Sequence, residues 1–291
     1  MDASTKWIQN GITVAGDHGD GNGKNQLSNP CGLAVDDHQT VYIADSWNHR
    51  IVAWELGATT GRVVAGGNGG GNRADQLTSP TGVIIDKKRD CLIVCEHENK
   101  RVVRWPCKNG TRGETIISGV QCYGLTMDDQ GYLYIPDYNK HEVRRYRIGD
   151  TQGTVVAGGN GSGNRLDQLN CPRYVCVDRE QSVYVSDYNN RRVTKWKKDA
   201  REGVFVAQLS LPYGVVVDHL GTVYVADHSN HQIMRWPQGV THGTVIIGGN
   251  GRGNQPNKLS CPHSLAFDQH GSLYVSDLEN HRIQRFNVDR N

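Results

Sequence analysis

The chain has 291 residues, and its 35 glycines are well above the average share for a soluble protein. Because glycine is costly inside helices and useful in turns, this composition argues against a helical bundle. The net charge of +2, from 32 basic and 30 acidic residues, excludes a strong global attraction to nucleic acid or anionic membranes, although not a local patch. No stretch is long and apolar enough to span a membrane, so we expect no membrane insertion.

One phrase recurs six times along the chain. Its first copy runs from Val41 to Trp54 and reads Val-Tyr-Ile-Ala-Asp, then Asn-His-Arg, then an aromatic residue. The copies return at intervals of about 40 or about 50 residues, which is the spacing of propeller blades. The acidic residues of the six copies are Asp45, Glu96, Asp137, Asp187, Asp227 and Asp277.

Each copy of the phrase belongs to a group of four short strands. A Pro-x-Gly turn opens an apolar run such as residues 30–36, which is typical of a buried strand. The β-branched and aromatic residues 41–45 form a second strand, residues 50–54 a third, and residues 61–65 a fourth. Six such groups predict an all-β fold, a six-bladed β-propeller of four-stranded antiparallel blades.

The two ends of the chain predict how the ring closes. The last copy stops soon after Phe286 and lacks a fourth strand, whereas residues 11–15 match the fourth-strand phrase. We therefore predict that the N-terminal strand pairs with the last blade, which removes an open sheet edge. The whole chain, 1–291, is then one propeller domain. The predicted bounds are 10–16 for the closing outer strand of blade six and 28–66, 78–118, 119–159, 170–208, 209–249 and 260–288 for blades one to six.

The Asp and Asn-His-Arg phrase resembles the NHL-repeat family, named for its Asn-His-Leu motif, and the resemblance covers all six copies. It implies a six-bladed propeller that serves mainly as a recognition platform. Some relatives lie at the C-terminus of tripartite-motif ubiquitin ligases and bind RNA or protein, and one, the amidating lyase, is a zinc enzyme. The departures from the phrase are Lys100 in blade two, Lys140 and Glu142 in blade three, and Gln232 in blade five.

Residues that repeat in most blades are interpreted as scaffold. The aromatic residue that ends each phrase is expected to pack between blades. The repeated acid and arginine flank one tight turn and are expected to form an ion pair there, and His49, His231 and His281 are interpreted as structural. Four Gly-rich loops are expected to be ordered surface loops that bury a leucine, with an anion cradle as the alternative. These loops are residues 16–27, 66–77, 158–169 and 248–259.

Positions that vary among otherwise equal blades are the best functional clue. The residue between Pro and Gly should rim the central channel, and the residue after the acid of the second strand should lie on the same face as the Gly-rich loops. Tyrosine and arginine at such positions are typical of binding hot spots. With Trp47, which stands in a turn, the predicted binding residues are Trp47, Tyr123, Tyr138, Arg173, Tyr188, Tyr213, His228 and His263.

We expect a non-catalytic recognition or scaffold module whose partner is a protein, with no cofactor and no catalytic residue. A glycan is an alternative ligand. A metal-dependent lyase or hydrolase of the amidating-lyase type would need three convergent histidines, but only His263 is expected at the inner rim. RNA is an alternative partner because basic residues cluster in blades three and four. They are Lys140, His141, Arg144, Arg145, Arg147, Arg173, Arg191, Arg192, Lys195, Lys197 and Lys198.

The eight cysteines do not repeat in every blade, which argues against a metal lattice. Cys91 and Cys107 begin and end a hairpin centred near residue 99, so we predict a disulfide between them, with Cys95 and Cys122 as a second pair. The even count favours an extracellular setting and leaves the compartment otherwise open. The polar start, residues 1–5, is typical of a fragment, so we expect a monomeric domain that is part of a longer chain.

Overall fold

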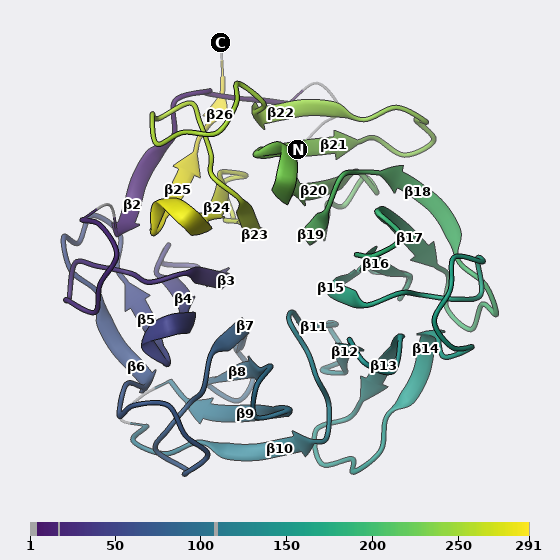
Figure 1. The fold of residues 1–291 in the computed structure, drawn as a ribbon, viewed down its shortest axis with the longest axis horizontal. Helices are drawn as coiled ribbons and strands as arrows, with labels where there is room; N and C mark the ends of the chain where they lie inside the picture. The colour runs from purple at the N-terminus through teal and green to yellow at the C-terminus, as the bar shows by residue number, and fades with distance from the viewer. Residues whose placement is uncertain (1–4, 17, 108–109, 291) are drawn as a thin grey trace.

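The computed structural model describes residues 5–16, 18–107 and 110–290, and they form a ring of six four-stranded antiparallel sheets (Figure 1). The predicted all-β, six-bladed propeller is confirmed. Within the described ranges, helical structure is confined to three short turns, η1 (Ser46–Asn48), η2 (His228–Asn230) and η3 (Leu278–Asn280). In those ranges no helix has the length and apolar character that a membrane crossing requires.

The first three blades follow one another along the chain, each with its innermost strand first. Blade one consists of β3 (Pro30–Val35), β4 (Val41–Asp45), β5 (Arg50–Trp54) and β6 (Arg62–Gly66). Blade two consists of β7 (Pro80–Asp86), β8 (Cys91–Glu96), β9 (Arg101–Pro106) and β10 (Glu114–Ser118). Blade three consists of β11 (Thr126–Met127), β12 (Leu133–Asp137), β13 (Glu142–Tyr146) and β14 (Thr154–Gly158).

The last three blades complete the ring. Blade four consists of β15 (Pro172–Val177), β16 (Val183–Asp187), β17 (Arg192–Trp196) and β18 (Val204–Gln208). Blade five consists of β19 (Pro212–Val217), β20 (Val223–Asp227), β21 (Gln232–Trp236) and β22 (Thr244–Gly248). Blade six consists of β23 (Pro262–Phe267), β24 (Leu273–Asp277), β25 (Arg282–Phe286) and β2 (Ile12–Gly16).

The ring is closed by strands from both ends of the chain. Strand β2 pairs antiparallel with β25, so that the purple N-terminal strand lies beside the yellow last blade in Figure 1. This confirms the predicted closure. A second, two-stranded contact joins β1 (Lys6–Trp7) to β26 (Val288–Asp289). The side chain of Trp7, in β1, is buried and contacts the rings of Tyr224 and Phe267. Its indole N–H donates a hydrogen bond to the carbonyl oxygen of Gly271.

The repeated residues are scaffold, as predicted. In blade one Asp45 accepts from the Arg50 guanidinium at 2.6 Å and from the backbone N–H of Ser28, and both charged side chains are nearly inaccessible to water. The same ion pair recurs in blades two, four and six. The aromatic residues that end the phrases are all buried. They are Trp54, Trp105, Tyr146, Trp196, Trp236 and Phe286.

The Gly-rich loops are held through their carbonyl oxygens. The Arg50 guanidinium donates hydrogen bonds to the carbonyls of Asn22 and Gln26 in the loop before blade one, and Asn48 donates to the carbonyl of Gly21. Arginines at the same position hold the other three loops, and they are Arg101, Arg192 and Arg282. The leucines that end the loops are fully buried, namely Leu27, Leu77, Leu169 and Leu259. The expected ordered loops with a buried leucine are therefore confirmed.

The repeated histidine links each of these loops to the blade before it. The backbone N–H of Ser79, where blade two begins, donates to Nδ1 of His49 in blade one at 3.1 Å. The same bond is made by the histidine of every other blade that a Gly-rich loop follows. These pairs are Cys171 with His141, Cys261 with His231, and Asn29 with His281.

The arginine of the phrase holds the loop before its blade, and the histidine bonds to the chain after the loop that follows its blade. These two roles explain where these two residues of the NHL-like phrase are replaced. Blades two and four are followed by a short connection, and they carry Lys100 and Arg191 in place of the histidine. Blades three and five are preceded by a short connection, and they carry Glu142 and Gln232 in place of the arginine. The phrase therefore keeps its histidine and its arginine only where there is a loop for each to hold.

The structure places no disulfide between Cys91 and Cys107, contrary to the prediction. In the hairpin of β8 and β9 the residue opposite Cys91 is Pro106, one position earlier than the predicted centre implies. Because a shift of one residue moves a side chain to the other face of a strand, the two thiols are not directly opposed. The second predicted pair is confirmed, because a disulfide joins Cys95 to Cys122, whose Cα atoms are 6.0 Å apart.

Candidate functional site

In every blade except blade three, a β-bulge in the innermost strand aims one residue at the rim of the central channel. In blade four the pairing of β15 with β16 shifts register between Pro172 and Val175, and Arg173 lies in that bulge. Tyr213 and His263 lie in equivalent bulges of blades five and six. Since a bulge re-aims the side chain of the extra residue, the Pro-x-Gly position faces the channel rather than a neighbouring strand.

The Arg173 guanidinium lies within a cage of four tyrosine rings. Its Nη1 donates to the hydroxyl of Tyr213 at 2.7 Å, and its Nε is buried without a hydrogen-bond partner. Such contacts between a cation and aromatic faces are favourable, most of all where water is excluded. The distances from Cζ to the ring centroids are 3.8 Å for Tyr188, 4.2 Å for Tyr123, 4.7 Å for Tyr213 and 5.6 Å for Tyr138.

The cage continues into a band of aromatic rings on both sides. On the blade-two side His97 lies 4.2 Å from the ring of Tyr123. On the other side the ring of Tyr213 contacts His228 at 4.4 Å and His263 at 4.5 Å. We call this set the rim cluster. It consists of His97, Tyr123, Tyr138, Arg173, Tyr188, Tyr213, His228 and His263.

Seven of the eight predicted binding residues are therefore brought together. The exception is Trp47, whose side chain is 61% exposed in the turn η1 of blade one. No ring contact joins it to the rim cluster among the residues that the structure describes. The turn of blade one instead carries the small residue Ser46 at the position that supplies a ring in blades two to five.

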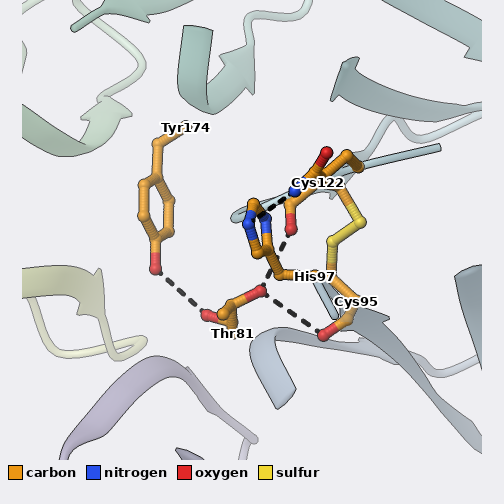
Figure 2. The surroundings of a disulfide bond; sticks show 6 residues. Thr81, Cys95, His97, Cys122 and Tyr174 are labelled. Carbon is orange, nitrogen blue, oxygen red and sulfur yellow. Dashed lines mark hydrogen bonds between the residues drawn. A yellow bond between two sulfur atoms is a disulfide. The ribbon is translucent and has the colours of Figure 1, made fainter. Parts of the chain in front are cut away.

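Blade three presents its rim residue differently from the other blades. Its innermost strand β11 pairs with β12 only at residues 126–127, so the segment 120–125 does not extend the sheet. That segment is held by its neighbours instead. The disulfide ties Cys122 to blade two, and the Thr81 hydroxyl donates to the carbonyl of Cys122 (Figure 2). On the other side the N–H of Gly124 donates to the carbonyl of Arg173.

Tyr174 forms the floor of the rim cluster, and the sequence analysis missed it. Its hydroxyl donates to the Thr81 carbonyl across the channel at 3.1 Å (Figure 2) and lies 2.9 Å from Nδ1 of His263. Four blades carry glycine at this position, and the Tyr174 ring packs against one of them, Gly124. The sequence does contain a signal for Tyr174. Blade four has tyrosine where the Pro-x-Gly turn usually has glycine, and this is the largest side chain at that position in the six blades.

On the other side of Tyr174 from the rim cluster, the channel contains a cavity of about 280 Å³ lined mainly by apolar residues. Inner-strand residues of all six blades line it, including Leu33, Val83, Leu125, Val175, Val215 and Leu265. Tyr174 lines the cavity and also bonds His263 of the rim cluster. The two ends of the channel therefore differ in chemistry, with a polar, aromatic rim on one side and an apolar chamber on the other.

Burial keeps the histidines of the rim cluster neutral. It lowers the pKa of His97 and of His228, and it lowers the pKa of fully buried His263 well below the ordinary value, with a smaller contribution from the nearby His228. Burial also raises the pKa of Tyr123 and Tyr213, so both phenols keep their protons. The positive charge at the rim is thus carried by Arg173 alone.

The neutral state of His263 predicts that acid destabilises the fold. Because its pKa is lower in the folded protein than in the unfolded chain, the unfolded chain takes up the proton first as the pH falls. Stability is complete above about pH 6.5 and is lost below it by about 1.4 kcal/mol per pH unit for one such histidine. Urea unfolding at several pH values should show this slope reduced in His263→Asn. The exposed His270→Asn variant should keep the wild-type slope, and equal slopes in all three proteins would contradict the prediction.

The rim histidines do not form a zinc site of the amidating-lyase type. His228 and His263 have ring centroids 6.3 Å apart, whereas the ring of His97 contacts Tyr123 at a tilted angle. Across the described ranges no three His, Cys, Asp or Glu side chains are grouped closely enough to hold a metal ion. The residues present therefore do not fit the metal centre of that alternative.

Several of the basic residues of blades three and four have partners within their own blade. Arg144, Lys195 and Arg192 form ion pairs with carboxylates of their own blades, and so does Lys140. Arg145 and Arg147 lie over the ring of Tyr132, away from the rim cluster. Four of the eleven listed basic residues are thus paired with carboxylates, and two more lie over an aromatic ring.

A family model of the NHL repeat matches residues 27–54 and 259–286, which hold the first three strands of blade one and of blade six. The other four blades repeat the same strand order, turns and buried aromatic residue. This chain is a six-bladed β-propeller with NHL repeats in blades one and six. No curated protein of matching sequence was found.

Several solved structures share the fold of this NHL propeller at low sequence identity. A protein of unknown function from Bacteroides thetaiotaomicron has a TM-score of 0.77 and 17% identity, over 98% of this chain and 77% of that one. An auxiliary nutrient binding protein from the same organism has a TM-score of 0.75 and 17% identity, over 99% and 78%. A gluconolactonase from Xanthomonas campestris has a TM-score of 0.65 and 15% identity, over 91% and 87%. Propellers of this shape thus include binding proteins and enzymes, and the likeness concerns the fold alone.

Proposed function

We propose that this NHL propeller is a non-catalytic recognition module that binds a partner protein through the face carrying the rim cluster and the Gly-rich loops. The observation that carries the proposal is the Arg173 guanidinium held among four tyrosine rings at the mouth of the channel. Arginine and tyrosine are among the residue types that dominate binding energy at protein interfaces. Arg173 and Tyr213 are held by inner-strand bulges, and the segment of Tyr123 is held by the disulfide, so little conformational entropy is lost on binding.

The arrangement favours a protein over RNA as the partner. Binding along a nucleic acid backbone uses several phosphate contacts from an extended basic surface. Six of the eleven basic residues of blades three and four are instead engaged in ion pairs within their own blade or lie over the ring of Tyr132. A single guanidinium in an aromatic setting is better suited to one anchoring group of a protein.

A capture experiment with matched surface variants tests this function. Three purified proteins are immobilised at equal density. They are the wild type, a rim variant with Tyr123→Ala and Tyr188→Ala, and a control variant with Leu220→Ala and Val240→Ala. Leu220 and Val240 are exposed apolar residues outside the rim cluster. We expect at least one protein to be retained by wild type and control and reduced about tenfold or more on the rim variant, with nuclease treatment having no effect. Equal recovery on all three surfaces, or loss of the bound protein after nuclease treatment, would contradict the proposal.

A further inference from the structure

We propose that the rim cluster recognises a carboxylate group of the partner, and that Arg173 is the residue that binds it. This inference rests on the proposed function and names the chemistry of the anchoring group. The inference is based on the positive charge of Arg173, which the fold holds in place without pairing it with a carboxylate. Each arginine of the NHL phrase is paired with an acid, whereas the guanidinium of Arg173 has no carboxylate partner among the residues that the structure describes.

The surroundings of Arg173 account for its position but leave its charge uncompensated. The tyrosine faces attract the cation, and the hydroxyl of Tyr213 accepts one of its N–H groups at 2.7 Å. Its Nε is shielded from water and has no acceptor. A guanidinium offers five N–H donors, so most of its hydrogen-bonding capacity remains for a ligand. Removal from water makes the positive charge costly unless an anion approaches it.

A carboxylate matches these donors better than other groups do. Its two coplanar oxygens can accept two parallel hydrogen bonds from a guanidinium, which makes such pairs stronger than bonds between neutral groups. The phenols of Tyr123 and Tyr213, kept protonated by burial, provide further O–H groups in the same cluster. An ammonium or quaternary ammonium ligand is disfavoured because Arg173 already fills the aromatic cage.

The charge around the rim limits the size of the anion. Exposed Glu98 acts on His97, and Glu279, which is paired with Arg252, acts on His228. The Glu98 carboxylate would repel a chain of phosphates that lay across its side of the face, whereas a single carboxylate can reach the guanidinium of Arg173. An acidic peptide segment of a protein is therefore favoured over a nucleic acid.

Arrays of random peptides, each about twelve residues long, test this chemistry on the intact propeller. One array contains Asp and Glu, and a matched array carries Asn and Gln at the same positions, both with amidated C-termini. A third array repeats the Asn and Gln sequences with free C-termini, which separates a terminal carboxylate from a side-chain one. We expect wild type to bind members of the first or third array at least about tenfold more tightly than their uncharged counterparts.

Variants locate the effect at Arg173. We expect the preference for carboxylates to be lost in Arg173→Gln and weakened in Arg173→Lys, which keeps the charge but not the planar pair of donors. The exposed Arg179→Gln variant, in the β15–β16 connection, should retain it. Melting temperatures measured alongside show whether each variant is folded, and the wild-type comparison needs no variant at all.

Two results would overturn the carboxylate inference while leaving the proposed function in place. One is peptide binding by wild type that depends on Tyr123 and Tyr188 but is equal for acidic and amide sequences. The other is an acidic preference that Arg173→Gln retains. If wild type binds no peptide on any array, and the capture experiment also finds no protein that depends on the rim, the proposed function fails with it.

Discussion

A protein lacking residues 1–16 is expected to lose cooperative unfolding or to melt far below the full chain. The deletion removes β2, which supplies the outer strand of blade six, and Trp7, which is buried against blades five and six. It leaves β25 as an exposed sheet edge. The expected loss is about 5 kcal/mol or more, a large part of the total stability of a typical domain. Thermal unfolding followed by circular dichroism measures it.

Single substitutions separate the contribution of Trp7 from that of strand β2. Trp7→Ala should cost about 3–5 kcal/mol, as expected for a buried tryptophan. Trp47→Ala is the matched control, because its indole is exposed and the change should stay within about 0.5 kcal/mol. A synthetic peptide of residues 1–16 should restore part of the stability of the deleted protein. A deleted protein that melts with the full chain would show that the N-terminal strand does not close the ring.

Reduction of the Cys95–Cys122 disulfide is expected to destabilise the protein and to loosen the rim cluster. The bond closes a loop with a sequence separation of 27, for which chain entropy predicts about 3–4 kcal/mol. It also holds the segment 120–125, which lacks the strand pairing that its counterparts have in other blades. Because Tyr123 lies in this segment, the cage around Arg173 should lose one of its walls.

Melting temperatures with and without a dithiol reductant test this prediction. Wild type should melt at a lower temperature when reduced, whereas Cys122→Ser should show a low melting temperature that the reductant no longer changes. Cys31→Ser is the control, since Cys31 is a buried cysteine outside the disulfide and its variant should keep the response to reductant. Hydrogen exchange should locate the loosening at residues 120–125. A reductant effect that persists in Cys122→Ser would assign it to another site.

Stability and the geometry of the rim cluster are physically connected in this arrangement. Figure 2 shows the disulfide beside His97, which lies two residues beyond Cys95. Tyr123 follows Cys122 directly in the chain. Tyr174 supports the same region through its bonds to Thr81 and His263. The site therefore rests on inter-blade contacts, and it depends on the closed ring that the N-terminal strand completes.

The sequence allowed most residues of the candidate site to be predicted, but not how their side chains contact one another. Equivalent positions of a repeat must lie at the same height in the ring, so the sequence could place Tyr123, Arg173 and Tyr213 on one face. It could not show that the guanidinium lies among four rings, because those rings come from blades three, four and five. Tyr174 was missed because it stands at the glycine position of the Pro-x-Gly turn, one residue beyond the variable position that pointed to Arg173.

The hairpin register was a second limit of sequence reasoning. The predicted centre of the blade-two turn was about half a residue too late, which placed Cys91 opposite Cys107. The structure pairs Cys91 with Pro106. The phrase itself contains the information, since Asp45 pairs with Arg50 across the same turn in blade one. A side chain that changes face with each residue makes such a small error decisive.

What the sequence by itself determined is the blade, the number of blades and the way the ring closes. Those features follow from local patterns, because each blade repeats its own strands, turn and buried aromatic residue. Only the tertiary structure decided which side chains meet at the channel, which cysteines are bonded and where a charge is left without a partner. These depend on contacts between blades separated by about 40 residues or more, and such contacts are set by packing around the ring rather than by any local pattern.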